Sequence, residues 1–231
     1  MNVAINGPEI LGYLFGNTSL PITETMRNSW IIMAFILFLC IFLTRRMEKI
    51  PKGKQALAVL MIDGLVDSTM GEGCRAFSPY IMTLMMSSLF GSLASLFWMR
   101  STTADLNTTL GWAIITFILI TYNKIKFGGI KGFLEPIFVM APLNVLSEIA
   151  TPVSMSFRHF GNMAGGLVIT TLIMGALKVL SNAVLGFLPV PLLQIGLPGV
   201  LSLYFDCFTA CMQAFIFSML TMAYVGDARG S

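Results

Sequence analysis

One apolar run of this chain, from Thr151 to Lys178, contains an arginine at position 158. The run is long enough to cross a bilayer, because a spanning helix needs about 20 mostly apolar residues. An ionised side chain near mid-bilayer costs roughly 2.5–3.5 kcal/mol or more, so such residues usually face a water-filled cavity or an opposing charge. We therefore interpret Arg158 as a functional residue and not as packing.

The composition assigns the whole chain to the membrane class. Of its 231 residues, 56% are hydrophobic and only 11% are charged, against about 25% charged in soluble domains. We expect an all-α polytopic membrane protein with about five membrane helices and one interfacial amphipathic helix, the last two helices long and strongly tilted. The net charge of +3 is too small to indicate nucleic acid. The four cysteines include no C-x-x-C pair, and we expect neither a metal nor a cofactor.

The apolar runs and the breakers between them divide a single membrane domain, residues 1–231, into segments. In chain order these are an extracytoplasmic, loop-like lead-in over 1–29, a first span over 30–44, an interfacial helix over 54–70, a second span over 78–98, a third span over 107–123, an arginine-bearing tilted helix region over 136–185 and a final tilted helix over 190–226. Ser78 is expected to cap the second span, with Pro79 in its first turn. Basic residues cluster after the first span, which by the positive-inside rule leaves the N-terminus outside.

The segment before the arginine contains two prolines, Pro136 and Pro142, and is expected to be a broken or re-entrant approach. The arginine helix itself is predicted to start at Thr151, with Pro152 in its first turn. At 100° per residue, its polar or small side chains share one face with Ile169: Ser154, Arg158, Gly161, Asn162 and Gly165. The G-x-x-x-G pair in this set favours close approach by another helix.

The final helix carries one ionisable side chain, Asp206, before its C-terminal end. The helical wheel aligns it with further small or polar residues: Ser202, Thr209, Ala210 and Gln213. Two interpretations of Arg158 and Asp206 are open: a salt bridge that only locks two helices, or an ion pathway. Cys207 and Cys211 are interpreted as packing residues.

Two more groups near helix starts also have alternative roles. Glu148 either lines an aqueous passage or is stabilised by the start of the arginine helix. Asp105 or Asn107 either caps the third span, which we favour, or lines an ion entrance.

Several motifs together resemble subunit a of the F-type ATP synthase, bacterial type. They are Ser156-Phe157-Arg158-His159-Phe160-Gly161-Asn162, Met212-Gln213-Ala214-Phe215-Ile216-Phe217 with Leu220-Thr221, Ala104-Asp105-Leu106-Asn107-Thr108, and Pro142-Leu143-Asn144. The resemblance covers the chain from about Trp30 to Val225. It implies a stator in the bacterial plasma membrane that carries H⁺ or Na⁺ through two offset half-channels, with no catalytic site of its own. The implied partners are a ring of c subunits, the peripheral-stalk b subunits, the soluble ATPase and the lipid bilayer.

By this likeness Arg158 faces the ring, with Asn162 and Gln213 close to it. The chain departs from the pattern at Leu167, where many relatives have glutamate, so Asp206 is expected to supply the missing acid. It also departs at His159, where relatives usually have leucine; a packing role is favoured over a proton relay. The rival hypothesis is a small, self-contained transporter that uses Arg158 and Asp206, although no internal repeat supports it. A membrane-embedded enzyme is disfavoured as well, because the chain contains neither a G-x-S-x-G nor an H-E-x-x-H motif.

Overall fold

The computed structural model describes residues 8–13, 21–44, 53–70, 74–97, 99–139, 141–184 and 196–230. Its longer helices are α1 (Glu24–Thr44), α2 (Lys54–Met70), α3 (Ser78–Leu93), α4 (Leu106–Val139), α5 (Ala141–Val184) and α7 (Thr209–Gly230). The shorter elements are the strands β1 (Ile10–Tyr13) and β2 (Pro21–Thr23), the 3-10 helices η2 (Arg75–Phe77), η3 (Ala94–Phe97) and η4 (Thr102–Ala104), the helix α6 (Leu197–Ser202) and the π-helix η6 (Leu203–Phe208). The described chain is therefore almost entirely helical.

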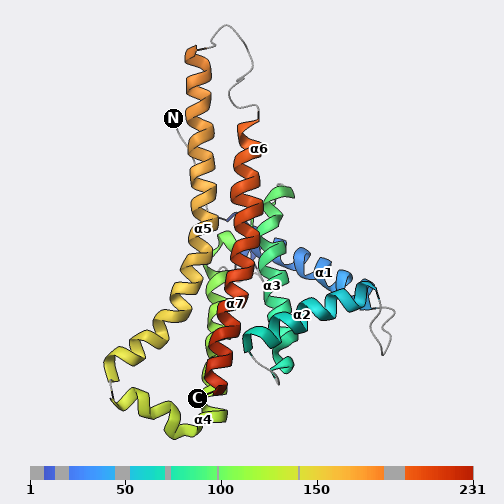
Figure 1. Cartoon of the computed structure of the whole chain (residues 1–231). Helices are drawn as coiled ribbons and strands as arrows, with labels where there is room; N and C mark the ends of the chain where they lie inside the picture. The colour runs from blue at the N-terminus through green and yellow to red at the C-terminus, as the bar shows by residue number, and fades with distance from the viewer. Residues whose placement is uncertain are drawn as a thin grey trace.

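Five helical stretches are long and apolar enough to cross a membrane within the described ranges: Glu24–Phe42, Arg75–Phe97, Leu106–Phe127, Ile149–Ser181 and Gly199–Ala228. The prediction of an all-α polytopic membrane protein with about five spans is confirmed. Figure 1 shows α5 beside the continuous column of α6, η6 and α7, and these two columns rise above the other helices. Helix α4 packs against both α5 and α7, whereas α1 and α2 extend to the opposite side.

The described part of the N-terminal lead-in contains regular secondary structure that the sequence did not indicate. Strands β1 and β2 pair antiparallel, and α1 begins at Glu24, six residues before the expected start of the first span. Polar residues of this first turn are held by tertiary contacts: Thr25 Oγ1 donates to Asp105 Oδ2 at 2.9 Å, and Asn28 Nδ2 donates to the Arg100 carbonyl at 3.0 Å. Because the hydrogen-bond partners of these polar residues are distant in sequence, the local sequence pattern predicted a loop here.

The start of the second span also differs from the prediction. Helix α3 follows η2, its N-cap is Phe77, and the Ser78 Oγ is buried with no hydrogen-bond partner among the described atoms. Ser78 therefore does not cap the helix. Pro79 does lie in the first turn, as expected, where its missing N–H removes no helical hydrogen bond.

The arginine helix is longer than predicted. Helix α5 starts at Ala141, not at Thr151, and its 44 residues correspond to about 66 Å. Pro152 lies inside it, not in its first turn, and Figure 1 shows α5 changing direction in its lower half, as expected of an internal proline. The segment that contains the two prolines is broken, because α4 ends at Val139 and α5 begins at Ala141. Helix α4 is also interrupted earlier, at Gly129, whose φ is 70°. Only glycine adopts this backbone conformation readily.

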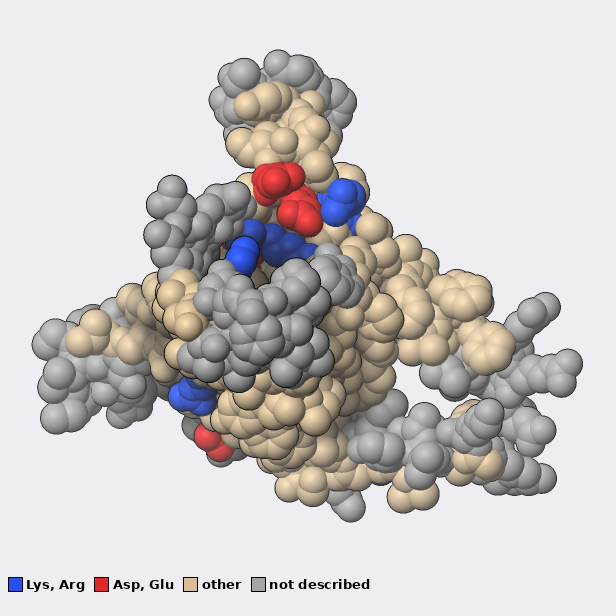
Figure 2. Space-filling view, turned by 90° about the horizontal axis from the view of Figure 1, so that it is seen from above, with Lys and Arg blue, Asp and Glu red and all other residues tan. Residues whose placement is uncertain are grey.

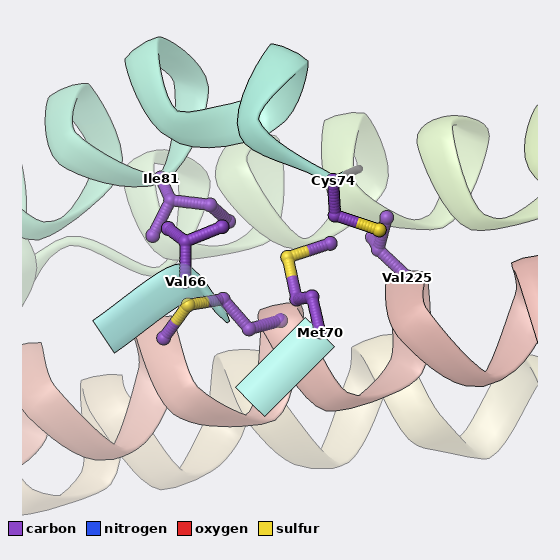
Figure 3. Close-up of a cluster of buried hydrophobic side chains, with 6 residues drawn as sticks. Val66, Met70, Cys74, Ile81 and Val225 are labelled. Carbon is purple, nitrogen blue, oxygen red and sulfur yellow. The ribbon is translucent and has the colours of Figure 1, made fainter. Parts of the chain in front are cut away.

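Helix α2 has the predicted bounds and packs on the bundle. Its Val66 and Met70 lie in a buried cluster with Cys74, Ile81, Met222 and Val225, shown in Figure 3. Three side chains of the predicted amphipathic pattern, Leu57, Met61 and Asp63, lie outside the described residues. This contact attaches α2 to α7 and α3, and its position at a membrane interface stays a prediction.

Candidate ion-translocation site

The predicted polar face of α5 is open to the outside of the chain. Arg158, Ser154 and Asn162 are all exposed, and Phe157 beside them is 54% exposed. A Cβ atom built on Gly161 would meet nothing within 4 Å, and the same holds for Gly165. No helix of the described structure therefore packs on the glycine pair, which leaves this face open to a separate partner.

The opposite face of α5 fixes this orientation. Met155, Ser156, His159 and Met163 are buried at helical spacing. The close helix approach occurs at Gly166, where a Cβ would lie 3.1 Å from the Phe205 ring in η6. Because these contacts hold one side of α5 against the bundle, Arg158 is directed away from it.

The arginine forms no internal salt bridge in the described structure. Among the described residues, neither a hydrogen bond nor an ion pair involves Arg158. Asp206 instead accepts a hydrogen bond from Ser202 Oγ at 2.6 Å. The interpretation of Arg158 and Asp206 as a lock between two helices therefore has no support in this geometry.

Asp206 lies in a π-helical turn that the sequence analysis missed. In η6 the Thr209 N–H donates to the Tyr204 carbonyl, five residues back, and the Thr209 hydroxyl donates to the same oxygen at 3.0 Å. A helical wheel that assumes 100° per residue does not predict correctly which side chains share a face across such a turn. Ser202 and Asp206 do lie together as predicted, while Gln213 is buried at 8% exposure and does not line the cavity beside Asp206. Single π turns are frequent at functional sites.

A cavity of about 430 Å³ adjoins Asp206. Its lining comes from α1, from η3 and the residues that follow it through η4, and from α5 and η6: Glu24, Ser95, Met99, Arg100, Ser101, Ala104, Met163, Leu167, Thr170, Thr171 and Asp206. Leu167 and Asp206, the two positions linked by the sequence argument about a missing acid, both line it. Figure 2 views the molecule from above and shows most of the visible charged side chains in one region, with a smaller group at the lower left of the view.

Glu24 and Arg100 are cavity residues that the sequence analysis did not select. Glu24 fell within the loop-like lead-in, and Arg100 lies just after the predicted second span. In the sequence both residues appear only as charged residues near the end of a membrane span. Such residues are common in membrane proteins, so they do not by themselves indicate a functional site. The common location of Glu24 and Arg100 depends on the packing of α1 against the turn before α4.

His159 is buried at 1% exposure, although Arg158 beside it is exposed. Its Nε2 lies 3.3 Å from Ser88 Oγ, and its ring packs edge-on against Trp112 and Phe217, with centroids 6.1 and 5.7 Å away. The Nδ1 atom has no hydrogen-bond partner in the described structure. This environment is that of a packing residue between helices.

The two candidates at the start of α4 have different environments. Asp105 caps the helix, because its Oδ1 accepts the Asn107 N–H at 3.0 Å, and its Oδ2 accepts from Thr25. The Asn107 side chain is exposed and lines a separate cavity of about 330 Å³. Glu148 lies within α5, but its side chain is outside the described residues.

Metal ligation has no support in the part of the chain that is described. Cys207 and Cys211 are free thiols, and no group of three or more histidine, cysteine or acidic side chains lies together in the described ranges. Two thiols on one helix fall short of the four-ligand sets of structural zinc sites.

The fold and the exposed arginine define a polytopic α-helical membrane protein with an ionised residue presented from one of its spans. A family model described as "ATP synthase A chain" matches residues 26–226. This chain belongs to that family, so it is an ion-translocating membrane subunit of an ATP synthase.

Individual relatives agree with this family. The chain is 32% identical to "ATP synthase subunit a, sodium ion specific" of Propionigenium modestum, over 91% of this chain and 75% of the relative. It is 31% identical to "ATP synthase subunit a" of Moorella thermoacetica, over 90% and 91% respectively. The subunit a of Desulforamulus reducens is 33% identical over 88% of this chain and 78% of its own length.

Proposed function

We propose that this chain is the stator that transfers H⁺ or Na⁺ to and from carboxylates on a rotating ring of c subunits. The observation that carries the proposal is the exposed Arg158 within a membrane-spanning stretch, with no partner among the described residues. A charge in this position requires an opposing group or water. A carboxylate on a neighbouring ring supplies the opposing group.

The electrostatics of such an encounter favour ion release. Opposite unit charges 4 Å apart attract by about 4 kcal/mol at an effective dielectric constant of 20. This attraction stabilises the ionised carboxylate, so the passing group loses its cation near Arg158. The same guanidinium repels a cation that would cross directly, and rotation of the ring becomes the productive path.

The surface beside Arg158 suits a protein partner within the membrane. Exposed apolar side chains cover the same columns: Val153, Phe157, Leu167, Ile169 and Leu172 on α5, and Leu203, Tyr204, Phe208, Met212 and Phe215 on η6 and α7. An apolar surface alone does not show whether the residues contact lipid or another protein. The open backbone at Gly161 and Gly165 favours a helix, because small residues permit close packing.

The cavity beside Asp206 is proposed as part of the outer half-channel. Its hydroxyl-bearing and charged residues provide polar contacts for an ion, and the rest of its lining is apolar. In this proposal Asp206 replaces the acid that is absent at Leu167, and Ser202 orients its carboxylate. The second half-channel lies on the cytoplasmic side, with Glu148 as its candidate acid, while Asn162 and Gln213 act close to Arg158.

The remaining proposals concern the assembly and its location. The chain is proposed to lie in the bacterial plasma membrane with its N-terminus outside the cytoplasm. It would contact the peripheral-stalk b subunits and act with the soluble ATPase, which performs the chemistry. A self-contained transporter that pairs Arg158 with Asp206 gains no support, since the two side chains form no ion pair.

The experiment uses the whole complex in vesicles, with ATP-driven ion uptake and ATP hydrolysis measured together. Arg158→Ala and Arg158→Lys are expected to abolish uptake, while hydrolysis by the detached soluble ATPase is retained. Lys178→Ala is the matched control, because Lys178 is another exposed cation of α5. Normal coupled uptake in the Arg158→Ala complex would disprove the proposed function.

A further inference from the structure

The cavity beside Asp206 contains a second carboxylate that comes from the first helix. Glu24, in the first turn of α1, lines the same space as Asp206 and Arg100. The hydroxyl-bearing residues Ser95, Ser101, Thr170 and Thr171 also belong to the lining. Two formal negative charges and one positive charge leave the lining with one net negative charge. A space of this size and polarity accommodates water and a small cation.

The other acids at this end of the molecule are not available in the same way. Both carboxylate oxygens of Asp105 accept hydrogen bonds, one from the Asn107 backbone and one from Thr25. Glu9 is exposed and does not line the cavity. Glu24 and Asp206 are thus the two carboxylates that the described lining presents to an ion.

The position of Glu24 is fixed by the fold. Its own N–H donates to the Glu9 carbonyl at 2.9 Å. The next residue, Thr25, is bonded to Asp105, and Asn28 is bonded to the Arg100 carbonyl. The last two contacts hold the start of α1 against the turn before α4, and the first joins it to the residue that precedes β1. Glu24 therefore lies on an anchored helical turn beside the cavity.

One ion pair involves Glu24 within the described chain. Arg27 Nη2 lies 3.6 Å from Glu24 Oε1, one helical turn away, and the two side chains are 49% and 26% exposed. Exposed pairs of this kind contribute little, with a median of about 0–1 kcal/mol. The pair therefore does not prevent the carboxylate from attracting a mobile cation.

We infer that Glu24 is the ion-collecting carboxylate of the outer cavity, which concentrates H⁺ or Na⁺ beside Asp206. This inference rests on the proposed function and adds a residue that acts before the ring is reached. A negatively charged, low-dielectric cavity raises the local concentration of cations. Without Glu24 the remaining lining has no net charge, so the outer ion must be supplied at higher concentration.

The test measures ATP synthesis by the intact complex in vesicles, at a fixed membrane potential and a varied outer ion concentration. Glu24→Gln is expected to raise the half-saturating outer ion concentration by about threefold to tenfold, as expected for one charge at close range. The maximal rate at saturating ion should be retained. Glu24→Asp keeps the charge and should restore most of the apparent affinity.

A matched control separates this role from general surface charge. Glu9→Gln removes the same charge from the same lead-in, outside the cavity, and should leave the half-saturating concentration unchanged. Raising the ionic strength to about 1 M with a non-transported salt shortens the screening length to roughly 3 Å and should reduce the difference between Glu24→Gln and the native chain. A structural defect would persist in salt.

The outcomes distinguish the inference from the proposed function. Equal half-saturating concentrations in the native and Glu24→Gln complexes, or an equal shift in Glu9→Gln, would overturn the role of Glu24. So would a loss of maximal rate that Glu24→Asp does not restore. Arg158→Ala tests the stator function independently, because its expected phenotype is loss of all coupled uptake at every ion concentration.

Discussion

Arg158 and His159 are adjacent in sequence and lie on different faces of α5, one exposed and one buried. The arginine is exposed, whereas the histidine is 1% exposed and packs against Trp112 and Phe217. A helix rotates by about 100° per residue, so burial of one neighbour directs the other outward. The packing of His159 therefore helps to set the direction in which the charge of Arg158 points.

His159→Ala should destabilise the subunit, since it removes a packed ring and leaves a void between α3, α4, α5 and α7. We expect a loss of about 1–3 kcal/mol in the free energy of unfolding. His159→Leu should cost less, because it retains most of the volume. Denaturation in detergent, followed by near-ultraviolet circular dichroism, measures the loss. The control is Phe157→Ala, since Phe157 is 54% exposed and its loss should have little effect.

Gly166 should tolerate no large side chain. A Cβ there would lie 3.1–3.3 Å from Phe205, and a leucine would separate α5 from η6. Gly166→Leu is expected to cost about 1–3 kcal/mol of stability, measured by thermal unfolding of the purified subunit. The adjacent Gly165→Leu faces open space and should leave that stability nearly unchanged. Equal destabilisation by both variants would contradict the assigned contact.

Asp105 should act in stability and not in ion conduction. Asp105→Ala removes the cap of α4 and the bond from Thr25, so we expect a loss of about 1–3 kcal/mol. Asp105→Asn retains an acceptor oxygen and should keep coupled ion uptake in reconstituted vesicles. Failure of uptake in a stable Asp105→Asn complex would instead place Asp105 on the ion route.

The ion pair between Asp67 and Arg75 should be sensitive to acid. Hydrogen bonds from Arg75, the shortest at 2.6 Å, hold the pKa of Asp67 below its ordinary value of 3.8. Because the pKa is lower in the folded state, the pair stabilises the fold above pH 4 and loses this contribution as the pH falls through the folded pKa. Hydrogen exchange of α2 amides should increase between pH 5 and pH 3 after correction for intrinsic rates. Asp67→Asn should remove this pH-dependent step.

The residues that line the cavity could not all be identified without knowing how the helices pack. The helical wheel predicted the exposed polar face at Ser154, Arg158 and Asn162, because that relationship lies within one regular helix. It could not place Glu24 beside Asp206, since these residues are 182 positions apart in sequence and their helices meet only in the folded bundle. The π turn at Leu203–Phe208 is likewise not predicted by a sequence pattern that assumes a fixed helical period.

The sequence by itself determined the membrane class, the number of spans and the position of Arg158 within one of them, because the length and composition of an apolar run are local properties of the chain. Only the tertiary structure decided where the arginine helix starts, which glycine receives a neighbouring helix and which carboxylates share a cavity. These features depend on contacts between distant segments, whose hydrogen bonds and close packing override the local preferences of prolines, caps and polar turns.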